Sequence, residues 1–108
     1  MTKEQQRIAI AEACGWTDCE YIKSLGLCKG KHKEVRSQYD SGHSALPDYL
    51  NDLNAMHEAE KVLMNDDPYA YGCYSCDLYE QYGNTVHLSA AQRAEAFLKT
   101  MGKWEEAQ

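Results

Sequence analysis

The sequence predicts a helix-rich α+β fold, in which three or four helices pack with a small antiparallel sheet or hairpin. Apolar side chains recur at helical spacing in four segments: residues 3–14, 47–64, 70–82 and 89–103. Residues 17–44 instead have poor periodicity and are interrupted by Gly26, Gly30 and Gly42, which is typical of loops and short strands. An all-α fold is the alternative. A length of 108 residues fits a single domain, 1–108, around one core.

The first helix is expected at residues 3–14. Its segment "KEQQRIAIAEAC" is rich in good helix formers, and Gly15 supplies a stop of the kind found just after helix C-termini. After this helix we expect a short antiparallel element within residues 18–40, with strands near 21–27 and 34–39.

The second helix is expected to begin near Pro47 and to end near Met64. Proline suits the first helical turn, and Asp48 places negative charge where the helix dipole favours it. Asp67 and Pro68 then form a cap and a first-turn proline for a third helix at residues 70–82. One face of that helix carries Tyr71, Tyr74, Leu78 and Tyr82. A strand is the alternative here, because tyrosine favours sheets.

The last helix is expected at residues 89–103. Ser89 and Gln92 form a capping-box pattern, and Gly102 can serve as the C-terminal cap. Its apolar stripe consists of Ala90, Ala94, Phe97, Leu98, Met101 and Trp104. This stripe is expected to face the core.

Two polar residues, His57 and Glu60, fall within the apolar stripe of the second helix. A buried carboxylate without partners is costly, so Glu60 needs a cation; Arg93 is the preferred partner and Arg7 the second choice. The zinc-protease motif is not met, because Lys61 stands where its second histidine belongs. We therefore interpret His57, Glu60 and Arg93 as a structural polar group, with a binding site and, last, catalysis as the alternatives.

The five cysteines are an odd number, which disfavours a fully paired disulfide framework. Cys73 and Cys76 form a CxxC, the spacing found in zinc knuckles and redox pairs. A zinc site needs a second half, which two pairs fit loosely: Cys14 with Cys19, and Cys28 with His32. Buried free thiols are the favoured interpretation, and a zinc-supported structural module is the alternative.

The net charge of −6 arises in residues 45–108, where eleven acidic residues face four basic ones. Five of the eight tyrosines also lie there, between Tyr69 and Tyr82, among acidic neighbours. Bases usually stack on aromatic residues in basic surroundings, so direct nucleic-acid binding is disfavoured. Core filling competes with a protein interface as the role of these tyrosines. The interface prediction consists of Tyr69, Tyr71, Tyr74, Asp77, Tyr79 and Glu80.

A basic segment at residues 29–36 is the candidate anion site. Its cations are Lys29, Lys31, Lys33 and Arg36. Positive charge on a segment flanked by glycine could hold a phosphate group. A solvated loop is the simpler interpretation of this pattern.

The sequence lacks the common motifs of catalytic sites. It contains no Ser-His-Asp order, nucleophile elbow, P-loop or GxGxxG, so we assign no catalytic residue and no cofactor and expect a protein that is not an enzyme. No apolar run approaches the roughly 18 residues that span a bilayer, and the first residues lack a signal-peptide pattern. We therefore expect no membrane contact and a location in the cytoplasm where the protein is made.

Three blocks of the chain stand out: "IAIAEACGW" (8–16), "LPDYLNDLNAMHEAEKVL" (46–63) and "AAQRAEAFLKTMGKWEE" (90–106). In this order they resemble small proteins of tailed bacteriophages and prophages, the phage ABA-sandwich domain family. The resemblance implies helices packed around a small sheet, and it implies no general activity and no functional residues. Residues 17–44 and 65–88 do not follow the family pattern, so recognition is expected there.

The favoured functional hypothesis is a phage accessory protein that inhibits a bacterial defence complex in the host bacterial cytoplasm, as an anti-CRISPR protein does. Its partner would be a host protein or protein complex with a basic surface, met by the acidic, tyrosine-rich segment. The first alternative is sequestration of a phosphorylated or cyclic-nucleotide signal by residues 29–36 of a homo-oligomer. The second is the zinc-supported module.

Overall fold

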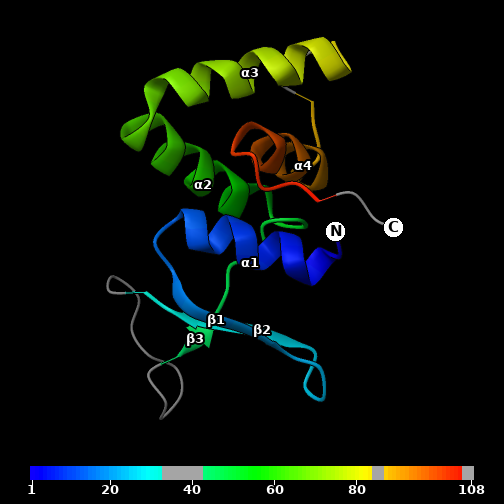
Figure 1. Ribbon diagram of the computed structural model, residues 1–108. Coiled ribbons are helices and arrows are strands. Elements are labelled where there is room, and N and C mark those ends of the chain that lie inside the picture. The colour runs from blue at the N-terminus through cyan, green and yellow to red at the C-terminus, as the bar shows by residue number, and fades with distance from the viewer. Residues whose placement is uncertain (33–42, 84–86, 106–108) are drawn as a thin grey trace.

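The computed structural model describes residues 1–32, 43–83 and 87–105. These residues form four helices and three strands, in the order α1 (Lys3–Ala13), β1 (Thr17–Ile22), β2 (Leu27–Lys31), β3 (Ser44–Ala45), α2 (Leu53–Asp66), α3 (Pro68–Tyr82) and α4 (Ala90–Thr100) (Figure 1). The helix-rich α+β prediction is confirmed. The all-α alternative is wrong, because three segments pair as strands.

The sheet is antiparallel, with the strand order β1-β2-β3. In the β1–β2 hairpin Ile22 pairs with Leu27, so residues 23–26 form the turn, with Gly26 at φ 60°. The predicted strand at 21–27 is therefore wrong, because its centre is this turn. The predicted strand at 34–39 lies outside the described residues.

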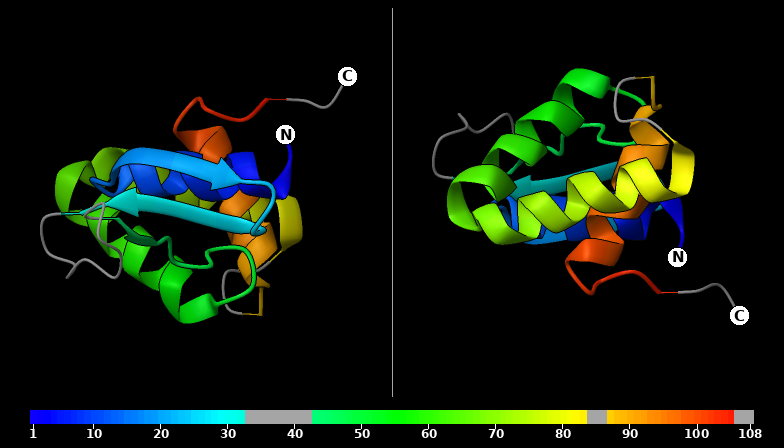
Figure 2. Two further views of the ribbon diagram at one scale, coloured as in Figure 1. Left: turned by 90° about the horizontal axis from the view of Figure 1, so that it is seen from below. Right: turned by 90° about the horizontal axis from the view of Figure 1, so that it is seen from above.

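The elements form successive layers from the sheet to α3. Helix α1 packs on β1 and β2, α4 packs on α1 and α2, and α3 packs on α2 and α4 (Figure 1). Viewed from the two opposite sides, the strands lie nearest the viewer on one side and α3 on the other (Figure 2). The sheet and the outer surface of α3 thus lie at opposite ends of the molecule.

Local hydrogen bonds at both ends of α1 and α4 explain where these helices begin and end. Thr2 and Gln5 form a capping box before α1, and Ser89 and Gln92 form the predicted one before α4. After α1, Gly15 at φ 95° allows its own N–H and that of Trp16 to reach the carbonyls of Glu12 and Ala11, a Schellman motif. Gly102 at φ 70° makes the same arrangement after α4.

Helix α2 begins at Leu53, and the predicted start near Pro47 is wrong. The Arg7 guanidinium donates hydrogen bonds to the backbone carbonyls of Leu46 and Pro47. These carbonyls therefore accept from a side chain rather than from the N–H groups of a helix. Asp52 then caps α2 by accepting a hydrogen bond from the Asn54 backbone N–H at 3.0 Å. In place of a first helical turn, residues 46–50 bury apolar side chains in the core.

Helix α3 begins as predicted, with Pro68 in the first turn and Asp67 as cap. The Asp67 carboxylate accepts from the Ala70 backbone N–H at 3.1 Å, and the same residue is the C-terminal cap of α2. One residue therefore joins the two helices. The strand alternative for residues 70–82 is wrong.

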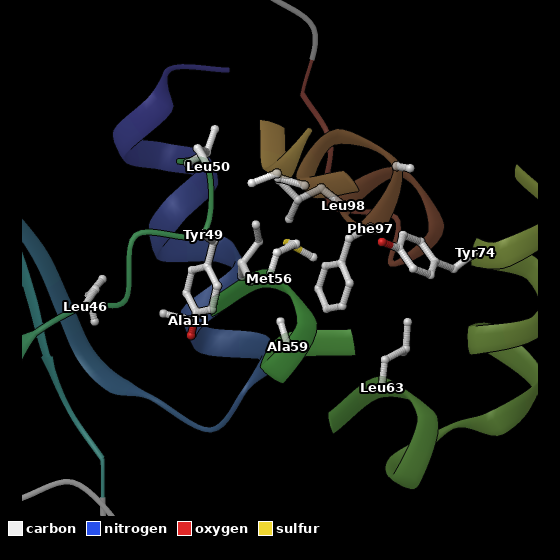
Figure 3. Packing of buried hydrophobic residues seen from close by; sticks show 14 of the residues in the cluster. Ala11, Leu46, Tyr49, Leu50, Met56, Ala59, Leu63, Tyr74, Phe97 and Leu98 are labelled. Atoms are coloured by element: carbon white, nitrogen blue, oxygen red, sulfur yellow. The ribbon is translucent and has the colours of Figure 1, made fainter. Parts of the chain in front are cut away.

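One cluster of buried apolar side chains draws on all four helices (Figure 3). Its largest fully buried members are Tyr74, Phe97, Ile10, Met56, Leu78 and Leu98. The Tyr74 ring meets Phe97 edge-on with centroids 6.0 Å apart, and Figure 3 shows Leu63 of α2 beside this pair. The core therefore holds the inner face of α3 and leaves its outer face uncovered by any described element.

Candidate functional site

The outer face of α3 carries the two most exposed large hydrophobic side chains found on the described helices, Tyr69 and Tyr79. It consists of Tyr69, Gly72, Cys73, Cys76, Tyr79 and Glu80, which recur at helical spacing and are all exposed. The exposed fraction is 83% for Tyr69 and 64% for Tyr79. These residues point away from the core because Tyr74 and Leu78, on the opposite side of the helix, are buried.

The structure separates the predicted interface residues into three groups. Tyr69, Asp77, Tyr79 and Glu80 are exposed, and the Asp77 carboxylate accepts a hydrogen bond from Thr100 at 3.3 Å. Tyr74 is fully buried, so its assignment to an interface is wrong: its position on the inner face of α3 makes it a core residue. Tyr71 is half-buried and lines a hollow between α2 and α3.

Acidic residues outnumber basic ones on α2 and α3. Residues 53–82 contain six acidic residues and a single lysine, Lys61. Of these acids only Glu60 is buried, while Asp66 and Asp67 are exposed at the α2–α3 junction. The exposed surface of α2 and α3 is therefore strongly acidic around its tyrosines.

The hollow between α2 and α3 has a volume of about 230 Å³. Its lining consists of His57, Glu60, Lys61, Met64 and Tyr71. Met64 is 44% exposed and extends the apolar surface beyond Tyr71. A space of this size accepts one side chain or a small ligand group.

Glu60 at this hollow forms a buried ion pair with Arg93 of α4. Arg93 Nη1 lies 3.1 Å from Glu60 Oε2 and 3.3 Å from Oε1, and the two side chains are only 7% and 10% exposed. His57 Nδ1 lies 3.3 Å from Glu60 Oε1 but is 46% exposed, so it borders the pair from the solvent side. Arg93, the partner preferred from the sequence, holds Glu60, whereas Arg7 bonds to backbone carbonyls.

The Tyr74 hydroxyl group lies beside this buried pair. Burial raises the pKa of Tyr74, the negative charge of Glu60 adds to that increase, and Arg93 opposes it. The phenol therefore stays protonated at neutral pH. The Arg93–Glu60 pair thus joins α4 to α2 in the interior, with a neutral phenol of α3 nearby, and no described nucleophile accompanies these groups.

The basic segment is only partly described, because Lys33 and Arg36 lie outside the described residues. Lys29 lies opposite Glu20 in the hairpin register, with Nζ 3.0 Å from Oε1. Lys31 lies 3.7 Å from the Asp18 carboxylate. Both described lysines are thus engaged with β1 acids, which weakens the case for an anion site.

The five cysteines are free and differ in exposure. Cys28 is buried, as expected, but Cys73 and Cys76 are exposed on α3, so the buried-thiol interpretation is wrong for this pair. The reason is their place on the outer face rather than the inner face of the helix. Among the described residues no group of three or more His, Cys, Asp or Glu side chains could hold a metal ion.

A second hollow, which sequence reasoning missed, lies between the end of α1, residues 46–50 and α2. It has a volume of about 310 Å³ and mainly apolar walls that include Trp16, His32 and Tyr49. The Trp16 and His32 rings meet with centroids 5.3 Å apart. The three segments are distant in the sequence, so their contact could not be predicted from local patterns. The one sequence signal for this hollow was the position of Trp16 directly after the end of a helix.

Among the described residues, no helix combines the length and apolarity needed to cross a membrane. Comparisons of the chain with protein-family models, with curated proteins and with solved structures return no match.

Proposed function

We propose that this chain acts by binding another protein through the outer face of α3. One observation carries the proposal: Tyr69 and Tyr79 are 83% and 64% exposed on an otherwise acidic helix surface. Removing a large apolar side chain from water is favourable, so a partner that covers these two tyrosines would gain binding free energy.

The chemistry of this face specifies a basic partner. Tyrosine supplies large contact area together with a hydroxyl group and loses little conformational entropy on binding. The acidic residues around it attract a positively charged surface and speed association with it. Bacterial complexes that cut or scan nucleic acid carry such surfaces. We infer that the target is a host defence complex of this kind and that the chain inhibits it by covering its nucleic-acid-binding surface.

The inferred origin is a phage or prophage. The three blocks that resemble the phage ABA-sandwich domain family fall on α1, α2 and α4 with their flanking residues, whereas α3 lies outside them. This division supports a scaffold of shared helices that presents one helix of its own to a target. The proposal makes the chain a binding inhibitor rather than an enzyme.

The test compares three proteins as affinity baits in lysates of candidate bacterial hosts. These are the wild type, a Tyr69→Ala/Tyr79→Ala double variant, and Tyr21→Ala, a control tyrosine that is 40% exposed on β1 at the opposite end of the molecule. The wild type and the control should recover one stoichiometric complex and inhibit its nuclease activity. The double variant should bind at least about tenfold more weakly.

Two outcomes would contradict the proposal. One is the absence of a stoichiometric partner in the lysates of all the candidate bacterial hosts. The other is a partner that the double variant binds as tightly as the wild type does, because the contact would then lie elsewhere on the chain.

A further inference from the structure

We propose that Cys73 and Cys76 form one half of a zinc site that a second copy of this chain completes, α3 against α3. The two residues are three apart on a helix and exposed on the same face. Residues at this spacing have Cβ atoms about 5–6 Å apart, close enough for both sulfur atoms to bind one tetrahedral Zn²⁺.

Residues 1–32, 43–83 and 87–105 do not supply the other half of such a site. All five cysteines and all four histidines lie in the described residues, where no group of three or more potential ligands is found. Cys19 and Cys28 belong to the strands, at the opposite end of the molecule from α3, and Cys14 ends α1, which lies between the sheet and the other helices (Figure 1). Because structural zinc is almost always held by four protein ligands, and the described residues offer only this pair, the site needs two further ligands, which we assign to a second copy.

A second copy offers them in the required arrangement. In a twofold dimer the same surface patch meets itself, so each chain contributes one CxxC and the metal gains four cysteine ligands. Gly72 lies beside these residues on the outer face, and a Cβ added to it would meet nothing within 4 Å, so the backbone of α3 is open to a close approach. Tyr69 and Tyr79 flank the pair and would be covered in the dimer.

Charge makes this dimer depend on the metal. Asp77 and Glu80 are exposed near the cysteines, so two such faces repel each other without a cation between them. On binding, four thiols lose four protons and the four thiolates bond to one Zn²⁺, with no change of oxidation state. Removing the metal restores the repulsion and separates the chains.

The dimer uses the same face as the proposed target site, so it rests on the exposure of that face but not on any target. Metal-bridged pairing and target binding should exclude each other. The experiment therefore uses the purified, reduced chain alone, and failure of the zinc site leaves the lysate experiment unaffected.

The experiment titrates Zn²⁺ into the full chain and measures molar mass by light scattering and bound zinc by elemental analysis. The expected result is one zinc per two chains and a doubling of the 12.3 kDa mass, both reversed by a chelator. Co²⁺ in place of Zn²⁺ should give the visible bands of a tetrahedral thiolate site. A Cys73→Ser/Cys76→Ser variant should stay monomeric, whereas Cys19→Ser, a thiol control on β1, should dimerise.

Three results would overturn the proposal: one zinc per chain in a monomer, a dimer that persists in the double serine variant, or no metal bound at all. The Co²⁺ spectrum of the wild type keeps the test decisive even if a variant folds poorly. A spectrum without thiolate bands counts directly against the site.

Discussion

Arg93 of α4 places one nitrogen atom, Nη1, within 3.3 Å of both carboxylate oxygens of Glu60 in α2. Both side chains are at least nine-tenths buried. The pair therefore links two helices where solvent screening is weak, beside the core residue Tyr74. Replacing one partner would leave the other as an uncompensated buried charge.

Arg93→Ala is expected to lower the free energy of unfolding by about 3–5 kcal/mol, the cost of breaking a buried pair from one side. Urea denaturation followed by circular dichroism measures this loss. The matched control is Lys61→Ala, which breaks the exposed pair between Lys61 and Glu58, 3.0 Å apart on the same helix. That change should cost less than about 1 kcal/mol. An equal decrease in the free energy of unfolding in the two variants would show that the buried pair stabilises the fold no more than the exposed pair does.

Two glycines should respond oppositely to alanine. At Gly30 a Cβ would lie 3.0 Å from Cys19 Sγ and 3.0 Å from Leu46 Cδ2, so Gly30→Ala is expected to cost about 1–3 kcal/mol through overpacking. At Gly72 the space is open and the backbone is helical, so Gly72→Ala is expected to add about 0.5–1 kcal/mol of stability. Thermal melts of the two variants measure both effects. A stable Gly30→Ala protein would contradict the close packing of β2 on residue 46.

A thiol-specific chromogenic reagent should detect two kinetic classes of cysteine near neutral pH. Cys73 and Cys76 are exposed and should react first, as two thiols per chain. Burial raises the pKa of Cys14 and of Cys19 from 9.0 to about 11, so little reactive thiolate is present, and Cys28 is buried. These three should react more slowly than Cys73 and Cys76, with the buried Cys28 the slowest. Five thiols reacting at one rate in the folded protein would contradict the exposures described above.

Stability should fall in alkaline solution, chiefly between about pH 9 and pH 11. In this window the unfolded chain loses the Cys14 proton while the folded chain keeps it, because burial raises the folded pKa from 9.0 to about 11. The folded state then binds more protons, so the free energy of unfolding decreases as pH rises, by at most about 1.4 kcal/mol per pH unit for this group. The full contribution is present below pH 9.

Denaturation of the wild type and Cys14→Ala at several pH values checks this sign. The difference between the two proteins should be constant below pH 9 and should change above it, with the flatter profile in the variant. Identical profiles up to pH 11 would mean that the Cys14 thiol titrates alike in both states.

Local signals predict most of the helix boundaries. The capping box at Ser89, the glycine stop at Gly15 and the Asp67–Pro68 start each act within one helical turn, so a single sequence contains all the information needed. The start of α2 differs from its prediction because the competing group is distant: Arg7 of α1 bonds to the carbonyls of residues 46 and 47. No pattern near Pro47 reports that contact.

The candidate site was predictable to a similar extent. The helical wheel places Glu60 on the buried side of α2, where its carboxylate needs a cation as partner, and Arg93 is that partner. The exposure of tyrosines was harder to predict, since Tyr74 and Tyr79 differ only in the side of α3 that they occupy. Which side is covered depends on where α2 and α4 pack, and this is a property of the tertiary structure.

The single-residue junction at Asp67 has a mechanical consequence for recognition. A connection this short, with Asp67 serving both helices at once, gives α3 little freedom to pivot against α2. The partner proposed above would therefore meet a helix whose angle to α2 is already set before binding. Binding should then cost little conformational entropy in α3, and the backbone of this helix should change little between the free and bound states.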